Sequence, residues 1–243
     1  AGAATTTITG VGKVAGTPVV TIDATADVSF SGFPITGAPP NVAGDSFGML
    51  AKQTTPTAGV TYTISDCKFV GTNNPAANGE FQFYASGGQE AIVFTRNVIT
   101  QYSGNAIVSE IHTGPTEISY SSFDAPLCNV DPADTIFFMT YGGKNVTTLQ
   151  SISYNTFNMS TANLKVTAVS INAPGPPTAV GNAKFTNMVI TGNTFNSLKN
   201  NGRAIQFRNG GGDGTQPAAN NIVSPVVTNN NIYGVSGSVG SYG

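Results

Sequence analysis

Acidic side chains are the residues most able to do chemistry in this chain of 243 residues, which contains twelve Asp and Glu. The tightest group is Asp124, Asp131 and Asp134, within the segment FDAPLCNVDPAD. Carboxylates that converge on one surface can act as general acid and general base in polysaccharide cleavage. Asp-Ala-Pro and Asp-Pro-Ala-Asp are also common turn formers. We therefore interpret the group as turn residues, and Asp124, Asp131 and Asp134 are the catalytic candidates if the protein is an enzyme.

The chain contains one histidine, His112, two residues after Glu110. On one strand the two side chains would share a face, which permits an acid–base pair. No GxSxG-like segment supplies a nucleophile, so an exposed pair without a catalytic role is the favoured interpretation. One histidine with Cys67 and Cys128 does not form a zinc ligand set. We expect two unpaired thiols, since only a loop that folds back would let Cys67 and Cys128 bond, and we expect no metal and no cofactor.

The composition excludes two classes of partner. Only 22 residues are charged and the formal net charge is −2, so the chain lacks the basic surface that binds nucleic acid. Its long uncharged stretches contain Pro, Gly and Asn, which predicts no membrane insertion as a helix. Hydrophobic residues make up 40 %, enough to build a folded core.

The elements that position these residues are indicated by a six-residue repeat. Each copy has an aliphatic residue or Phe, then Ser or Thr, any residue, a small or amide residue, any residue, and Phe or Ile. The copies are VSFSGF (28–33), ISDCKF (64–69), FTRNVI (94–99), ISYSSF (118–123), ISYNTF (152–157), ITGNTF (190–195) and VTNNNI (227–232). A second apolar run follows most copies and ends in Gly or Pro-Gly, as in EFQFYASGG. Units of this length that are incomplete alone are typical of the coils of a solenoid.

Stacking of such coils predicts the role of each repeat position. Residues one and six would point inward and form two apolar columns, because equivalent residues on stacked coils lie about 4.8 Å apart. Position four, with Asn97, Asn155, Asn193 and Asn230, is predicted to take the left-handed backbone of a corner. Stacked amides there can hydrogen-bond from coil to coil.

The repeat resembles that of right-handed parallel β-helix proteins, which include pectin lyases, polygalacturonases, phage tailspikes and many adhesins. ITGNTF and ISYNTF look like the asparagine-ladder corner of those folds. The resemblance implies an all-β fold, a single-stranded right-handed parallel β-helix of about seven coils. We expect residues 1–27 to form an N-terminal cap or arm, 28–233 the β-helix, and 234–243 a flexible C-terminal tail.

Position three indicates a binding surface. It holds Asp66, Arg96, Tyr120 and Tyr154 on four successive coils. If the position faces outward, Asp66 and Arg96 form an ion pair beside two stacked tyrosines. Such a row can be surface packing alone, or a platform for a sugar or a protein partner. These four residues are the binding candidates.

The sequence favours a non-enzymatic structural or attachment protein on an exterior surface, such as a phage virion decoration or fibre component. Its expected location is the virion, the extracellular space or the cell surface, its partner a capsid or other surface protein, and a glycan is a further candidate. The resemblance to phage β-helices implies a homotrimer. A small pectin-lyase-like enzyme is the alternative. Ice binding is the second alternative, since position two carries Ser or Thr in every copy.

Overall fold

Short parallel strands account for the regular structure that the computed structural model assigns. The structure describes residues 17–36, 45–71, 79–102, 104–124, 133–140, 144–159, 166–173, 183–198, 202–209 and 222–234, and these contain strands and no helix. Strands rich in Thr, Val, Ile and Phe fit the sequence, because these residues favour extended backbone. The described residues accordingly contain no helix that is long and apolar enough to cross a membrane.

Three sheets of seven strands each form the body of the protein. Sheet A contains, in spatial order, β1 (Val20–Ile22), β4 (Asp45–Ala51), β7 (Gly79–Ser86), β10 (Ile107–Glu110), β13 (Ala133–Met139), β17 (Val166–Ala173) and β21 (Arg203–Asn209). Sheet B contains β2 (Val28–Ser31), β5 (Thr61–Ser65), β8 (Ala91–Thr95), β11 (Thr116–Ser119), β15 (Gln150–Ser153), β19 (Met188–Thr191) and β22 (Val226–Thr228). Sheet C contains β3 (Pro34–Thr36), β6 (Lys68–Val70), β9 (Val98–Thr100), β12 (Ser122–Asp124), β16 (Thr156–Asn158), β20 (Thr194–Asn196) and β23 (Asn231–Tyr233). A fourth, two-stranded sheet pairs β14 (Asn145–Val146) with β18 (Lys184–Phe185).

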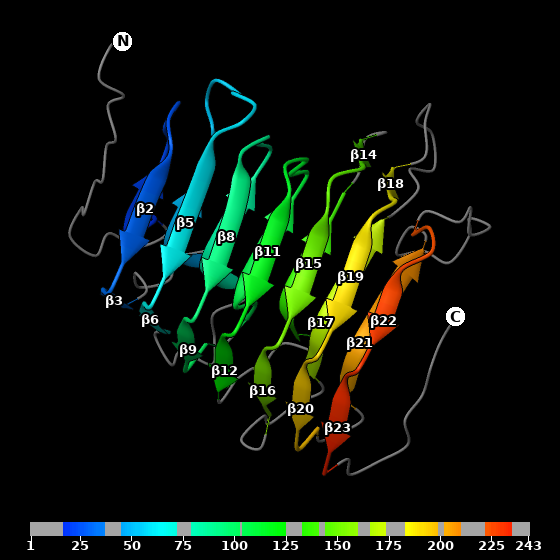
Figure 1. Cartoon of the computed structure of the whole chain (residues 1–243). Coiled ribbons are helices and arrows are strands. Elements are labelled where there is room, and N and C mark those ends of the chain that lie inside the picture. Colours follow the sequence, from blue (N-terminus) through cyan, green and yellow to red (C-terminus); the bar gives the residue numbers. More distant parts are fainter. Residues whose placement is uncertain are drawn as a thin grey trace.

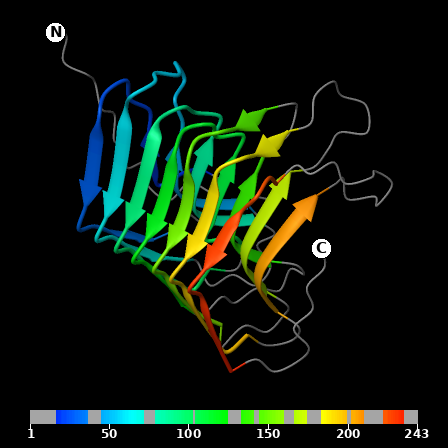
Figure 2. The same ribbon diagram turned by 45° about the vertical axis from the view of Figure 1, so that its right-hand side comes forward.

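The chain visits sheets B, C and A in turn and then repeats the circuit one strand further along (Figure 1). Among the described residues, six circuits are complete, and β1 precedes them while β22 and β23 follow. Figure 2 shows the strands of sheet B running downward and β17 and β21 of sheet A running upward on another side. The predicted all-β parallel solenoid is confirmed.

Like residues stack in the interior, as the repeat predicts. The position-one side chains from Ile64 to Ile190 and the position-six side chains from Phe69 to Phe195 are all buried and in register. The rings of Phe123 and Phe157 lie 4.9 Å apart at 8°, and those of Phe157 and Phe195 lie 4.9 Å apart at 11°. Each such buried side chain stabilises the fold by roughly 1.5–3 kcal/mol.

Position four forms a column of hydrogen bonds between coils. The backbone N–H of Cys67 donates to Asn97 Oδ1, that of Ser121 donates to Asn155 Oδ1, and that of Asn155 donates to Asn193 Oδ1. Each asparagine also donates from Nδ2 to a carbonyl of the preceding coil, as Asn155 does to Ile118 at 2.9 Å. These buried amides therefore satisfy the backbone groups that the corner leaves unpaired.

The predicted left-handed backbone at position four is wrong, because position three adopts it instead. Asp66, Arg96, Tyr120 and Tyr154 have φ values between 50° and 57°. Gly32 and Gly192 occupy the same corner with φ of 79° and 69°. The asparagines stabilise this corner by hydrogen bonding rather than by their own conformation.

The first repeat copy is shifted by two residues from the predicted alignment. Phe30, not Val28, pairs with Ile64, and Ile35 pairs with Phe69. Phe33, predicted to point inward at position six, therefore falls at position four and is 55 % exposed. VSFSGFPI offers apolar residues in both frames, and the buried pair Phe30 and Ile35 decides between them.

Within the described ranges, β21, β22 and β23 are the last strands of the three sheets, so they form one edge of the solenoid. Val227 and Ile232, at positions one and six, are 42 % and 45 % exposed there. Of the expected N-terminal cap or arm, residues 17–27 supply β1 to sheet A, and residues 1–16 lie outside the described residues. The expected tail, apart from Gly234, also lies outside them.

Replacing Asn155 by Ala is predicted to lower the free energy of unfolding by about 2–4 kcal/mol, because it leaves two buried backbone groups without partners. Asn230→Ala, in the partly exposed last coil, is the matched control, with an expected loss below about 1.5 kcal/mol. Urea denaturation of both variants measures the difference, and equal losses would contradict the role of the buried column.

Candidate functional site

The four predicted binding residues lie together on the outside of the corner between sheets B and C, and we call Asp66, Arg96, Tyr120 and Tyr154 the corner face. Arg96 donates two hydrogen bonds to Asp66, from Nε to Oδ1 and from Nη2 to Oδ2, each 2.8 Å long. This paired geometry is the strongest form of a guanidinium–carboxylate contact. The hydrogen bonds from Arg96 hold the pKa of Asp66 below its ordinary value.

The two tyrosines of the corner face form a solvent-exposed aromatic stack. Their ring centroids lie 5.2 Å apart at an interplanar angle of 10°. Tyr120 is 61 % exposed and Tyr154 is 54 % exposed, so the stack contributes a large apolar area to the surface. A Cβ on Gly192 would lie 2.6 Å from the Tyr154 ring, so the glycine of the next coil makes room for it.

The backbone of the corner face is held in a conformation that non-glycine residues rarely adopt. A non-glycine residue in the left-handed region is strained by about 1–2 kcal/mol. Two other coils avoid this cost by placing Gly32 and Gly192 at the same position. Large charged and aromatic side chains thus occupy four successive corners of the surface, which makes the corner face a candidate binding site.

The catalytic candidates do not form one site in the described residues. Asp124 belongs to β12 of sheet C, where it accepts hydrogen bonds from Ser122 and Asn158. Asp134 belongs to β13 of sheet A and lies 2.9 Å from Nη2 of Arg208. Asp131 lies outside the described residues. Asp124 and Asp134 thus have different partners on different sheets.

Asp134 links three strands of sheet A. It is 5 % exposed and pairs with Arg208 of β21 across β17, which lies between them. Burial raises the pKa of Asp134, and Arg208 opposes that shift. Removing Arg208 would leave the buried Asp134 carboxylate without its cation, so the pair stabilises the packing of these strands.

The prediction of an exposed Glu110–His112 pair is wrong. His112 is 2 % exposed and its Nε2 lies 3.7 Å from Oε1 of Glu90, which is also fully buried. Glu110 instead accepts a hydrogen bond from the hydroxyl of Tyr84. His112 lies between β10 and β11 and not on β10 itself. The alternation of side chains along a strand therefore does not place it on the same face as Glu110. Gly114 permits this packing, because a Cβ there would lie 1.9 Å from the Glu90 carbonyl.

Burial sets the ionisation of this Glu–His pair. It lowers the pKa of His112 to about 4 and raises the pKa of Glu90. Both directions favour uncharged side chains, in keeping with a separation longer than a hydrogen bond. The pair is enclosed, so it is a structural element and not an accessible acid–base catalyst.

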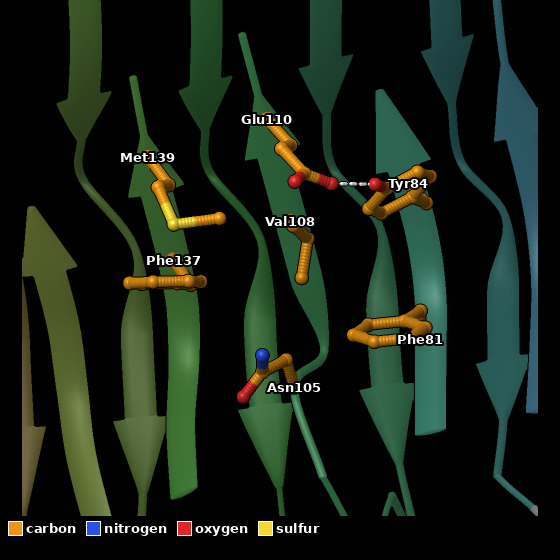
Figure 3. Close-up of a pocket in the computed structure, with 7 residues that line it drawn as sticks. All are labelled: Phe81, Tyr84, Asn105, Val108, Glu110, Phe137 and Met139. Carbon is orange, nitrogen blue, oxygen red and sulfur yellow. Dashed lines mark hydrogen bonds between the residues drawn. The ribbon is translucent and has the colours of Figure 1, made fainter. Parts of the chain in front are cut away.

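A groove on the outer face of sheet A is a site that the hexapeptide does not predict. Its volume is about 240 Å³. It crosses β7, β10 and β13, and Figure 3 shows its side chains rising from these neighbouring strands. The lining residues are Phe81, Tyr84, Asn105, Val108, Glu110, Phe137 and Met139. EFQFY and TIFFM are rich in aromatic residues, but Phe81 and Tyr84 are three residues apart, so the two-residue period of a strand does not indicate the groove.

The remaining sequence candidates have structural surroundings. Four hydroxyl residues of position two, Ser65, Thr95, Ser119 and Ser153, are buried, which removes the flat exposed row that ice binding needs. Cys67 is an unpaired, buried thiol whose pKa burial raises. Cys128 lies outside the described residues. Within the part of the chain that the structure describes, no cluster of three His, Cys, Asp or Glu could hold a metal ion.

Comparisons of the chain with protein-family models, with curated proteins and with solved structures found no match. The class of protein is therefore defined by the fold itself, a parallel β-solenoid with three sheets.

The single imidazole is predicted to stay neutral from pH 8 down to about 5, because its folded pKa is about 4. The stabilising effect of a neutral buried His112 is lost as pH falls from 6.5, its unfolded pKa, toward 4, because the unfolded state then binds the proton first. Proton NMR titration follows the one histidine without any assignment problem. A midpoint near 6.5 would contradict its burial beside Glu90.

Proposed function

We propose that this protein is a non-enzymatic structural and attachment protein of an exterior surface, of the phage virion decoration or fibre type. The corner face is the observation that carries the proposal. Its stacked tyrosines and its ion pair are exposed, and they project from coils that pack closely on one another. Rigid aromatic and Arg side chains are the residues that protein interfaces use most at their centres.

Rigidity supports an attachment role because it lowers the entropy lost on binding. The stacked phenylalanines and the buried asparagines fix each coil against its neighbours. The tyrosines of the corner face are thus oriented before a partner arrives, so little conformational freedom is lost on contact. The proposed partner is a capsid or other surface protein, and the proposed location is the virion, the cell surface or the extracellular space.

Tyr154→Gly tests the corner face without a large loss of stability. Glycine relieves the left-handed strain while the stack with Tyr120 is lost, so the free energy of unfolding should change by less than about 1 kcal/mol. Purified wild-type protein added to particles of the native source should sediment with them. Retention of Tyr154→Gly should fall at least about tenfold.

Asn229→Gly is the matched control, because Asn229 has the same left-handed corner conformation on the last coil, with φ of 55°. It should be retained like the wild type. Antibody labelling of the native source should place the protein on the exterior of particles or cells. Label confined to the interior, or equal retention of both variants, would contradict the proposal.

The proposed assembly is a homotrimer, as the likeness to phage β-helices implies. The exposed apolar residues of β22 and β23 supply surface for contacts between copies. Sedimentation equilibrium at micromolar concentration should give about three times the chain mass of 24.8 kDa. A single species of monomer mass would overturn the trimer.

A small pectin-lyase-like enzyme is the alternative, and the raised pKa of Asp134 is the observation that favours it. Such an enzyme would release unsaturated or reducing ends from polyuronates or neutral glycans, with or without calcium. Its activity would be abolished in Asp124→Asn or Asp131→Asn. The buried position-two hydroxyls give the ice-binding alternative no support, and thermal hysteresis would test it directly.

A further inference from the structure

We infer that the groove on the outer face of sheet A binds a neutral sugar ring of a glycan. The groove is separate from the corner face, since it lies on sheet A and the corner face lies between sheets B and C. The inference rests on the proposed attachment role and adds a ligand class to it. Drug-sized ligands occupy roughly 300–1,000 Å³, so a cavity of about 240 Å³ suits a single ring.

The middle of the groove is apolar on three sides. Val108 forms its floor and is 3 % exposed. Phe81 and Tyr84 of β7 stand along one side, and Phe137 and Met139 of β13 stand along the other (Figure 3). The rings of Phe81 and Tyr84 are 5.4 Å apart at 44°. Aromatic walls of this kind can pack against the C–H face of a pyranose.

An irregularity in β7 places both aromatic rings on the same face. Strict alternation would send Phe81 and Tyr84, three residues apart, to opposite sides of the sheet. The N–H groups of Gln82 and Phe83 both donate to the carbonyl of Ala106, the two-to-one pattern of a β-bulge. Bulges redirect side chains in this way next to functional sites.

The two ends of the groove are polar and differ in character. At one end, the Glu110 carboxylate lines the groove and accepts a hydrogen bond from the Tyr84 hydroxyl, so this end presents oxygen acceptors. At the other end, Oδ1 of Asn105 accepts from the backbone N–H of Asp134 at 3.2 Å. The Asn105 nitrogen points toward Val108 and can donate (Figure 3). The groove thus matches a ligand with O–H donors at one end, an oxygen acceptor at the other and C–H groups between.

Charge selects among the sugars that have this shape. Of the seven lining residues, Glu110 alone is charged. A uronate would bring a second negative charge beside it with no lining cation to compensate. Arg208, on β21 two strands beyond β13, pairs with Asp134. The groove therefore favours a neutral hexose over a uronic acid.

Saturation-transfer NMR on the full chain tests this inference with methyl glycosides of glucose, galactose, mannose and N-acetylglucosamine, and with methyl glucuronide as the acidic probe. At least one neutral glycoside should bind, and the glucuronide at least about tenfold more weakly. Phe137→Ala should weaken neutral binding at least about tenfold. Glu110→Gln should reduce the difference in affinity between the neutral glycosides and the glucuronide, because it removes the repulsion between the Glu110 carboxylate and the uronate.

Phe33→Ala is the matched control, since it removes an exposed aromatic ring of the first coil, outside both the groove and the corner face, and should change binding less than about twofold. Tyr84→Phe keeps the ring and removes the hydroxyl, so it tests the site even if Phe137→Ala fails to fold. Three results would overturn the inference: no neutral probe binds, the glucuronide binds as well, or Phe137→Ala and Tyr84→Phe leave binding unchanged. Loss of self-association in Phe137→Ala, which would show that a second copy fills the groove, would also overturn it. These experiments use no particles, so their failure is distinguishable from failure at the corner face.

Discussion

The whole structure depends on parallel strands stacking in register, one coil above the next. Register places each residue directly over its equivalent, about 4.8 Å away. Identical side chains must then fit against one another, which is why Phe123, Phe157 and Phe195 stack nearly parallel in the interior. The same constraint aligns the position-four amides so that each satisfies backbone groups of its neighbour. The stacked rings of the interior and the hydrogen-bonded amides of the corners therefore both result from in-register stacking of the coils.

The constraint also governs the outer surface. Position three must turn the chain with a positive φ on each coil, and its side chain then points to solvent. Neighbours along this corner contact each other just as neighbours in the core do, which produces the Asp66–Arg96 ion pair and the Tyr120–Tyr154 stack. On sheet A, the bulge at Gln82 interrupts regular alternation and brings Phe81 and Tyr84 onto one face. The proposed recognition surface at the corner thus arises from regular stacking, and the proposed one on sheet A arises from a local departure from it.

The hexapeptide predicted sheets B and C well because both strands lie inside it, with the corner between them. It gave the correct inward residues from Ile64 to Phe195, and the contacts of Asp66 with Arg96 and of Tyr120 with Tyr154. The hexapeptide failed where two alignments fit the sequence and only side-chain packing distinguishes them. VSFSGFPI fits two registers, and only the burial of Phe30 and Ile35 separates them. The connections that lead to sheet A vary in length, so neither the register of its strands nor its groove could be derived from the repeat. The contact between Glu90 and His112 joins two turns that lie outside the hexapeptide, so the repeat could not predict it either.

The stacking itself is tested most directly by double-mutant cycles among Phe123→Leu, Phe157→Leu and Phe195→Leu. If each ring contacts only the next coil, the pairs 123/157 and 157/195 should show coupling energies of about 0.5–1.5 kcal/mol. The pair 123/195, separated by one coil, should be additive within about 0.3–0.5 kcal/mol. Additivity in the two adjacent pairs, or equal coupling in all three, would contradict a column of stacked side chains.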